Sequence, residues 1–290
     1  RWASPRCRFP DMATRLRTLG PQDLWAIQEF LLQRPVENLF LIHKLHQYGV
    51  DERMLGFFHG FERDGQLTAV CMNGGTLFPA GVDPEAIPAF VSAVGERRRH
   101  CASILGPSMM ALGLYLGLTT RFRDDWMNVV NVRQRQPLMA LTGPPLVVPD
   151  PRVRQLTTRD FDSYLAASVA MYTDEIGASP YKHGPGYDGH VKERLRSRDA
   201  WGVVDNNGRV MFKADLGPRV GDHAQLQGVW LDPSLRGRGR SAALLSGMLI
   251  QAQEHHPVIS LYVNDFNTPA IRLYERLGFQ EVGSLSTVHY

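Results

Sequence analysis

The chain has 290 residues and an ordinary globular composition, with 43% hydrophobic and 21% charged residues. This length exceeds the usual size of one domain and predicts two domains of about 140 residues each. A formal net charge of +3 is too small to indicate nucleic-acid binding. Three cysteines (Cys7, Cys71 and Cys101) without Cys-x-x-Cys spacing predict reduced thiols and a cytoplasmic protein.

The chain begins with a segment that we leave out of the fold prediction. Residues 1–11 carry charges and prolines but no apolar run like that of a signal peptide. We expect a leader or a disordered segment there, with Met12 opening the natural protein.

Residues 12–141 predict a first α/β domain. Its expected helices cover residues 24–32, 39–48, 87–98 and 109–118. Its expected strands cover residues 15–19, 103–105 and 126–132, and a hairpin through Asp64-Gly65 joins residues 56–58 to 69–71. The uncharged stretch 101–120 is interrupted by glycines and a proline, so we predict a buried element rather than a membrane span.

Residues 142–151 are rich in proline and predict a linker, after which residues 152–290 form a second domain. Its expected strands cover residues 153–156, 200–204, 209–215, 224–231, 258–263 and 284–290. Its expected helices cover residues 160–171 and 187–196, a stretch that begins near residue 241, and a stretch around residue 274. A hairpin turn is expected at Asn206-Asn207-Gly208. This order predicts a mixed α+β sheet, of the α/β class, with helices on both faces.

The most informative segment is the loop that joins the strand ending at Leu231 to the next helix. Its glycines let the backbone approach a ligand closely, and the first turn of the helix offers unpaired N–H groups at the positive end of the helix dipole. Three arginines add positive charge, so we predict a pyrophosphate site. The spacing fits neither a P-loop, which needs a lysine, nor a dinucleotide fingerprint, which needs a third glycine. The expected binding residues are Arg236, Gly237, Arg238, Gly239, Arg240 and Ser241.

A second motif follows the strand at 258–263. Thr268 is expected to cap a helix that has Pro269 in its first position and Gly278 at its end. The motif residues after the loop are Asn267, Ala270, Tyr274 and Gly278-Phe279. Loop and motif together resemble the signature of the GCN5-related N-acetyltransferase (GNAT) superfamily, with Ser241 in place of the usual last Gly or Ala.

The resemblance is specific over residues 152–290 and weak over residues 12–141. The pairing of an N-terminal copy that lacks the motifs with a C-terminal domain that carries them is similar to two-domain bacterial acetyltransferases such as mycothiol synthase. An actinobacterial-type group with an uncharacterised N-terminal domain is more similar still, in the runs Asp174–Pro180, Phe212–Asp215, Gln227–Trp230 and Leu261–Asn267. In the first half, the loop position (residues 77–84) holds two prolines, which lack N–H donors, and Asp83, which repels phosphate. We therefore expect a degenerate GNAT-like domain there, which cannot hold coenzyme A.

The resemblance implies that acetyl-CoA binds and assigns roles to several residues. The backbone N–H of Val229 would polarise the thioester carbonyl, and the backbone of Leu231 would pair with the pantetheine arm. Asn267 would contact the coenzyme. Tyr274 would protonate the departing thiolate, since a phenol pKa of about 10 is close to that of a thiol.

The general base is less clearly indicated. Some relatives have a Glu four residues before the carbonyl-polarising position, where this chain has Gln225, which cannot titrate. Gln225, Gln227 and Val229 are expected to share one strand face by parity, where the glutamines could order a water molecule. Glu175, expected in the loop between the first two helices of the second domain, is the leading base candidate. Weaker candidates are Asp215 and His223.

The predicted function is that of an acetyl-CoA-dependent N-acetyltransferase acting on a small-molecule or peptide primary amine. Direct attack in a ternary complex is expected, because no cysteine follows residue 101 to form an acyl-enzyme. One alternative is acyl transfer to the cysteine amine of a mycothiol-like amino sugar. Another is a non-catalytic coenzyme-A-binding regulatory module. We expect no metal site, no nucleic-acid or membrane partner, and a monomer or homodimer.

Overall fold

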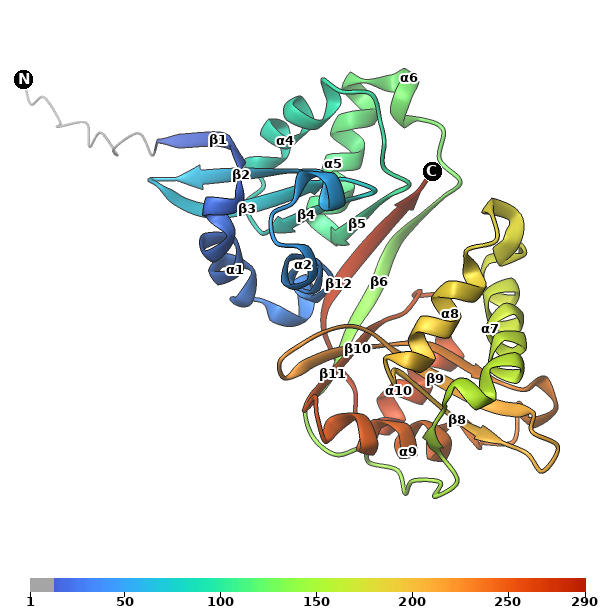
Figure 1. Cartoon of the computed structure of the whole chain (residues 1–290). Coiled ribbons are helices and arrows are strands. Elements are labelled where there is room, and N and C mark those ends of the chain that lie inside the picture. Colours follow the sequence, from blue (N-terminus) through green and yellow to red (C-terminus); the bar gives the residue numbers. More distant parts are fainter. Residues whose placement is uncertain (1–12) are drawn as a thin grey trace, which may run out of the picture. The chain divides into compact units, whose positions relative to one another are not determined.

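The computed structural model describes residues 13–290 (Figure 1). The predicted leader, Cys7 and Met12 lie outside the described residues. The chain forms two compact units. Of the described residues, unit 1 comprises residues 13–34, Lys44–Gln134 and Leu285–Tyr290, and unit 2 comprises Pro35–His43 and Arg135–Ser284.

Unit 1 is a mixed sheet with helices, in the strand order β1-β2-β3-β4-β5 followed by the end of β12. Its strands are β1 (Thr14–Leu19), β2 (Phe57–Arg63), β3 (Gln66–Asn73), β4 (Thr76–Gly81), β5 (Ser103–Pro107) and the last residues of β12 (Gln280–His289). Its helices are α1 (Leu24–Leu32), the end of α2 (Pro35–Tyr48), α3 (Glu52–Leu55), α4 (Ala86–Gly95), α5 (Ser108–Arg121) and α6 (Arg123–Trp126). The hairpin predicted at Asp64-Gly65 is confirmed, because β2 and β3 pair in antiparallel register around it.

The strand predicted at residues 126–132 is wrong. Residues 123–126 form the short helix α6, and strand β6 covers Asn131–Leu141 instead. Trp126 is 1% exposed, and its ring packs edge-to-face on Tyr290 with the centroids 5.7 Å apart. The aromatic side chain therefore joins the core of unit 1 from a helical turn, where a β-prone composition had suggested a strand.

Unit 2 is also a mixed sheet, in which the end of β6 is followed in order by β11, β10, β9, β8 and β7. Its strands are β7 (Arg154–Gln155), β8 (Ala200–Val204), β9 (Val210–Val220), β10 (His223–Leu231) and β11 (Val258–Tyr262). Its helices are the start of α2 (Pro35–Tyr48), α7 (Phe161–Ile176), α8 (Tyr187–Arg196), α9 (Ser241–Gln253) and α10 (Thr268–Leu277). The predicted class and the predicted order of elements are confirmed, and the turn at Gly208 joins β8 to β9.

Helices cover both faces of the sheet in unit 2 (Figure 1). On one face, α9 and α10 contribute Leu245, Met248 and Leu277 to a core that includes Ile259 of β11. On the other face, helices α7 and α8 pack on the sheet. Their core includes Tyr164, Val191, Leu195, Val210 and Trp230.

Both units contain the same β-loop-α-β arrangement. Strands β4 and β5 are parallel and joined by α4, and strands β10 and β11 are parallel and joined by α9. In unit 1, residues 285–289 of β12 pair with β5, whereas in unit 2 residues 138–141 of β6 pair with β11. Each unit thus includes a strand segment from the other half of the sequence. The domain boundaries stay a prediction.

Among the described residues, no helix is long and apolar enough to cross a membrane. The uncharged stretch 101–120 forms β5 and α5. The side chains of Ile104, Met110, Leu114 and Leu118 in this stretch are all fully buried in the core of unit 1.

Candidate functional site

The parallel pair β10–β11 in unit 2 opens after three residues. The pairs are His223↔Val258, Ala224↔Ile259 and Gln225↔Ser260. Beyond them, β10 continues to pair with β9, and β11 continues to pair with β6. The two strands therefore part toward their carboxyl ends, which is where ligands bind in sheets with parallel strands.

A β-bulge interrupts β10 on the edge of this opening. Gln227 pairs with Asp215 and Trp230 pairs with Lys213, so β10 has one residue more than β9 between these pairs. Gly228 has φ +62°, a left-handed conformation that glycine adopts without strain. The bulge takes the peptide between Gly228 and Val229 out of the regular ladder.

The bulge also reverses the alternation of side chains along β10. Val229 packs with Leu226 in the core on the α9 and α10 face, whereas Trp230 belongs to the core on the α7 and α8 face. The prediction that Gln225, Gln227 and Val229 share one face is therefore wrong for Val229. Strand parity holds only where no extra residue is inserted.

A buried polar network lies against the bulge. Lys213 Nζ lies 2.5 Å from Asp215 Oδ2 and donates a hydrogen bond of 2.9 Å to the carbonyl oxygen of Gly228. Tyr164 Oη donates to Asp215 Oδ1 at 2.9 Å. Lys213 is 0% exposed and Asp215 is 5% exposed. Both oxygens of Asp215 are thus engaged by protein donors, which argues against Asp215 as the general base.

Burial and charge act in opposite directions on this network. Burial lowers the pKa of the Lys213 ammonium, and the adjacent carboxylate of Asp215 acts against that shift. Burial raises the pKa of the Tyr164 phenol, as does the charge of Asp215. The phenol is therefore a permanent donor to the carboxylate. Sequence reasoning missed Lys213 and Tyr164, although two charges spaced two residues apart in an apolar strand signal a buried pair on one face.

Arg194 of α8 binds the glutamine that precedes the bulge. With the oxygen of the Gln227 amide turned toward the guanidinium, the two Nη atoms of Arg194 donate to it at 3.0 and 2.8 Å. Arg194 also donates to the carbonyl oxygen of Leu216. Gln227 is therefore held by a cation, a contact that the sequence did not indicate.

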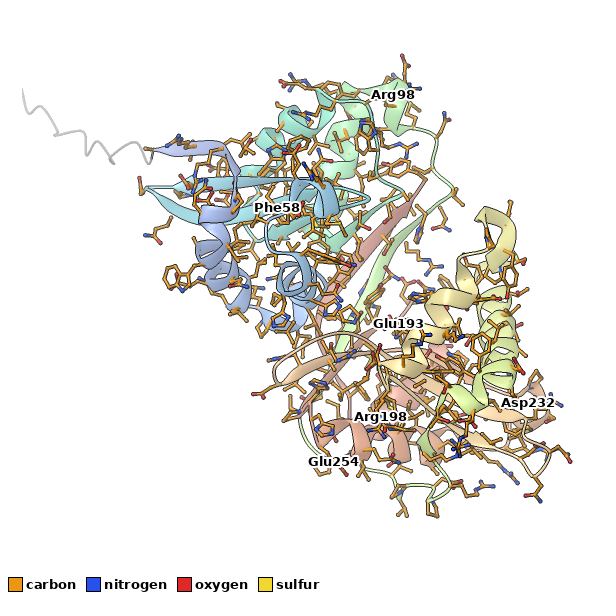
Figure 2. All side chains as sticks on the ribbon, viewed as in Figure 1. Phe58, Arg98, Glu193, Arg198, Asp232 and Glu254 are labelled. Atoms are coloured by element: carbon orange, nitrogen blue, oxygen red, sulfur yellow. The ribbon has the colours of Figure 1, made fainter. Side chains whose placement is uncertain are left out.

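The loop after β10 begins with a fixed turn. Asp232, which is labelled in Figure 2, lies directly after the strand and is 1% exposed. Its carboxylate accepts hydrogen bonds from Ser234 N at 2.9 Å and Ser234 Oγ at 2.6 Å. Arg209 pairs with the same carboxylate. This arrangement anchors the chain where it leaves the sheet, before the glycines of the loop.

The rest of the loop presents open backbone. Gly237 has φ +72° and Gly239 has φ +68°, and a Cβ at either residue would have no atom within 4 Å. Helix α9 begins at Ser241, and its N-cap residue, Arg240, makes no side-chain capping bond. The side chain of the N-cap residue therefore does not occupy the N–H groups of the first turn, and binding of an anion there stays a prediction.

The three arginines of the loop differ in their surroundings. Arg236 donates from Nε to the carbonyl oxygen of Leu231 at 2.9 Å and pairs with Asp174 at 2.9 Å. Its side chain is therefore engaged by the protein and joins the loop to the end of α7. Arg238 and Arg240 are exposed.

Helix α10 brings the second motif to the site. Asn267, rather than the predicted Thr268, is the N-cap, and its Oδ1 accepts a hydrogen bond from Ala270 N at 3.3 Å. The end of the helix at Gly278, with φ +100°, is confirmed. Tyr274 is 9% exposed, and its ring centroid lies 5.7 Å from that of Phe279. Burial, with a contribution from the charge of Glu175, raises the pKa of Tyr274 to about 12.

Glu175 lies in the last turn of α7 and not in a loop, so its predicted position is wrong. The helix continues five residues past the predicted end at Met171 and stops at Gly177, which has φ +75°. The exposed carboxylate of Glu175 acts electrostatically on both Tyr274 and Lys213. These three residues therefore share one neighbourhood. His223 starts β10 at the closed end of the β10–β11 pair, away from the opening.

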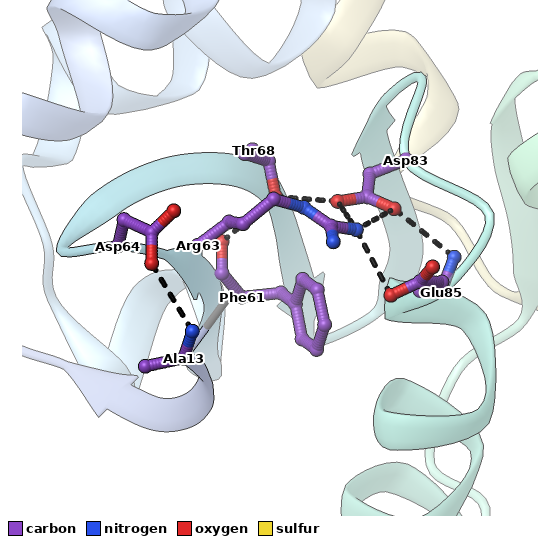
Figure 3. Close-up of polar contacts among 7 residues, drawn as sticks. All are labelled: Ala13, Phe61, Arg63, Asp64, Thr68, Asp83 and Glu85. Carbon is purple, nitrogen blue, oxygen red and sulfur yellow. Dashed lines mark hydrogen bonds and ion pairs between the residues drawn. The ribbon is translucent and has the colours of Figure 1, made fainter. Parts of the chain in front are cut away.

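The corresponding loop of unit 1 is closed by a carboxylate of the chain itself (Figure 3). Asp83, between β4 and α4, accepts hydrogen bonds from Glu85 N at 3.1 Å, Thr68 Oγ1 at 2.8 Å and Arg63 at 2.9 Å. Burial alone would raise the pKa of Asp83, but these bonds hold it below its ordinary value. Asp83 thus engages the N–H of Glu85 and the side chains of Arg63 and Thr68, and its own negative charge would repel an external anion.

Within residues 13–290, apart from those side chains that the structure leaves undescribed, no three His, Cys, Asp or Glu residues are placed to hold a metal ion.

Comparisons with known proteins agree with this geometry. Residues 169–279 match the model of the acetyltransferase (GNAT) family, and residues 56–164 match a domain of unknown function, DUF4081. The chain is 29% identical over 160 residues to a mycothiol acetyltransferase of Thermomonospora curvata, covering 52% of this chain and 51% of that protein. It is 29% identical over 174 residues to a mycothiol acetyltransferase of Rhodococcus erythropolis, covering 53% and 56% respectively. The chain thus spans about half the length of these curated relatives.

A solved GCN5-related N-acetyltransferase from Sphaerobacter thermophilus is similar over nearly the whole chain. The TM-score is 0.61 at 14% identity, covering 98% of this chain and 96% of that one. At this identity the likeness shows the fold. Residues 169–279 thus match an acetyltransferase (GNAT) family domain, residues 56–164 match a domain of unknown function, and the chain as a whole shares the fold of this solved structure.

Proposed function

We propose that the chain is an acetyl-CoA-dependent N-acetyltransferase that transfers an acetyl group to a primary amine by direct attack in a ternary complex. One observation carries this proposal. The β10–β11 ladder opens after Gln225 and Ser260, between a bulged peptide at Gly228 and a helix N-terminus without a side-chain cap at Ser241. A thioester with a nucleotide tail fits such an arrangement, because its carbonyl needs a donor and its pyrophosphate needs unpaired N–H groups.

The residues of the loop suit the coenzyme. N–H groups between Arg236 and Ser241 would hold the pyrophosphate, and the open backbone at Gly237 and Gly239 supports close approach. The exposed Arg238 would add charge, as would Arg240, while Arg236 would keep the loop in place through Asp174. The backbone of Leu231 would pair with the pantetheine arm. Asn267 would contact the coenzyme through the part of its amide that does not cap α10.

The bulged peptide would supply the main electrostatic contribution. The N–H of Val229 would donate to the carbonyl oxygen of the thioester as negative charge develops there. Loss of one such donor in an enzyme typically costs about 3 kcal/mol of transition-state stabilisation. Val229 is thus assigned a role through its backbone, and its side chain belongs to the core.

Proton transfers are assigned to Glu175 and Tyr274. Glu175 would accept the proton that the amine loses as its nitrogen bonds to the carbonyl carbon. Tyr274 would donate to the sulfur as the carbon–sulfur bond breaks. With its pKa at about 12, complete proton transfer to a thiolate of ordinary pKa is uphill by roughly 5 kcal/mol. Tyr274 is therefore assigned a hydrogen bond to the leaving sulfur, rather than the matched proton transfer that an unshifted phenol suggests.

The test is release of thiol from acetyl-CoA across a panel of primary amines, which includes an amino-sugar-linked cysteine amine because two relatives are named mycothiol acetyltransferase. We expect turnover on at least one amine, and a loss of kcat in Tyr274→Phe and Glu175→Gln. Turnover that survives both substitutions together would contradict these roles. Binding of coenzyme A without turnover on any amine would favour a non-catalytic regulatory module. The observation that supports this alternative is Gln225, which stands where some relatives have a titrating Glu.

The remaining expectations accompany this proposal. We propose a cytoplasmic protein without a nucleic-acid partner, active as a monomer or homodimer. Size-exclusion chromatography with light scattering tests the oligomeric state.

A further inference from the structure

The peptide unit that joins Gly228 to Val229 has two polar ends, and the structure shows what holds one of them. The carbonyl oxygen of Gly228 accepts a hydrogen bond of 2.9 Å from Lys213 Nζ. The N–H of Val229 belongs to the same planar unit. In a trans peptide the C=O and N–H bonds point in opposite directions, so a group that fixes the oxygen also fixes the direction of the N–H. No peptide bond of the described residues is cis.

Lys213 is itself held in place. Asp215 Oδ2 lies 2.5 Å from its Nζ, and Tyr164 Oη donates to the other oxygen of that carboxylate at 2.9 Å. Lys213 and Asp215 are spaced two residues apart on β9, so both point to the face that α7 and α8 cover. The ammonium therefore approaches Gly228 from that face and directs the N–H of Val229 away from it.

The fit around this contact is tight. A Cβ on Gly228 would lie 2.3 Å from Asp215 Oδ2 and 2.9 Å from Lys213 Nζ. The glycine therefore provides both the left-handed turn of the bulge and the space for the ion pair. A donor bonded to a peptide oxygen also polarises the unit, and in a low-dielectric interior this strengthens the hydrogen bond that its N–H can donate.

We infer that Lys213, held by Asp215, is a positioning residue for acyl transfer. It grips the carbonyl of Gly228 and thereby aims and polarises the N–H of Val229, the donor to the thioester carbonyl. This inference rests on the proposed function. Lys213 acts through the peptide and does not itself contact the reacting atoms.

The test replaces the ion pair without leaving a buried charge. Lys213→Met alone would leave the carboxylate of Asp215 buried and unpaired, which destabilises a protein strongly. The double variant Lys213→Met/Asp215→Asn removes both charges and keeps an acceptor for Tyr164. A matched control is Arg219→Met/Asp199→Asn. It removes a 2.5 Å ion pair between Arg219 of β9 and Asp199, the residue before β8, near the start of β10 and away from the bulge.

The measurements do not depend on knowing the acceptor amine. Calorimetry gives the Kd of coenzyme A, and circular dichroism verifies folding. Polarisation of the thioester carbonyl is measured by difference infrared spectroscopy of bound acetyl-CoA that carries carbon-13 at this carbonyl. We expect the parent chain and the control variant to lower the carbonyl stretching frequency of bound acetyl-CoA relative to that of free acetyl-CoA. We expect the Lys213→Met/Asp215→Asn variant to bind coenzyme A within about threefold of the parent, with the carbonyl frequency returned toward the free value.

Where an amine substrate is found, kcat should fall at least about tenfold in this variant with little change in KM for acetyl-CoA, since loss of a whole oxyanion donor costs about 10² to 10³. An unchanged infrared shift in the folded variant would overturn the role of Lys213. Parallel loss of coenzyme binding and of the shift would also overturn it, because the pair would then only maintain structure. If the parent chain itself fails to bind acetyl-CoA, the proposed function fails and this inference with it.

Discussion

Substitution of Gly228 by alanine tests how the site is built. The residue has φ +62°, where a side chain costs about 1–2 kcal/mol. Its Cβ would also lie 2.3 Å from Asp215 Oδ2 and 2.9 Å from Lys213 Nζ, and overpacking of this kind adds about 1–3 kcal/mol. The free energy of unfolding of unit 2 should therefore decrease by about 2–5 kcal/mol.

A second glycine separates the two contributions. Gly208, in the turn between β8 and β9, has φ +78°, and a Cβ there would have no atom within 4 Å, so Gly208→Ala bears only the backbone cost. The two variants should then differ in free energy of unfolding by the cost of the collision with the ion pair. That cost is about 2 kcal/mol, which corresponds to about 4–8 °C in Tm.

The assay is thermal unfolding of both variants and the parent, followed by circular dichroism at one pH and one protein concentration. Gly228→Ala should melt well below Gly208→Ala. If the two variants melt within about 1 °C of each other, the bulge accommodates a side chain freely. The Lys213–Asp215 pair would then not require a glycine at position 228.

Three further predictions concern the binding loop, the thiols and unit 1. Gly239→Asp, which places a carboxylate on open backbone of φ +68°, should raise the Kd of acetyl-CoA at least about tenfold by calorimetry, whereas Gly208→Asp should leave it unchanged. Burial raises the pKa of Cys101 to about 11 and raises that of Cys71 as well. In native Cys7→Ser protein, neither remaining thiol should therefore react with a disulfide reagent at about pH 8. Rapid labelling of either thiol would contradict its burial. Asp83 has a depressed pKa in the folded chain, so its bonds stabilise above the unfolded pKa of about 4 and are lost as pH falls below it. The Tm difference between the parent and Asp83→Asn should accordingly be positive at about pH 7 and shrink toward about pH 3, and a difference that does not depend on pH would argue against a charged Asp83.

The N-terminal half illustrates how a local sequence signal acquires meaning from structure. Asp83 suggested a loop that repels phosphate, because a carboxylate and two prolines stand where the second half has glycines. The structure adds that the Asp83 carboxylate binds the donors of its own loop, with Arg63 and Thr68 supplied by β2 and β3. These partners lie 20 and 15 residues before Asp83, beyond the reach of a motif.

Local signals determined much of the candidate site. Glycines at positions 237 and 239, the helix that follows them, and the left-handed end of α10 at Gly278 were all predictable, because they depend on backbone freedom and capping within a few residues. The turn at Gly208 was predictable for the same reason. The end of α7 was marked in the same way by Gly177, with φ +75°, but the helix was predicted to end at Met171, before that glycine, and Glu175 was therefore misplaced.

Only the tertiary structure decided the features that depend on groups far apart in the chain. The left-handed conformation of Gly228 in the β10 bulge was not predicted from the sequence, because it is stabilised by Lys213 and Asp215 from the neighbouring strand. The partners of β5 and β11 were likewise undetermined, since many strands of similar composition can form the same hydrogen bonds. Composition and turn chemistry act over a few residues, whereas strand pairing and burial of an ion pair gain their free energy only when distant segments meet.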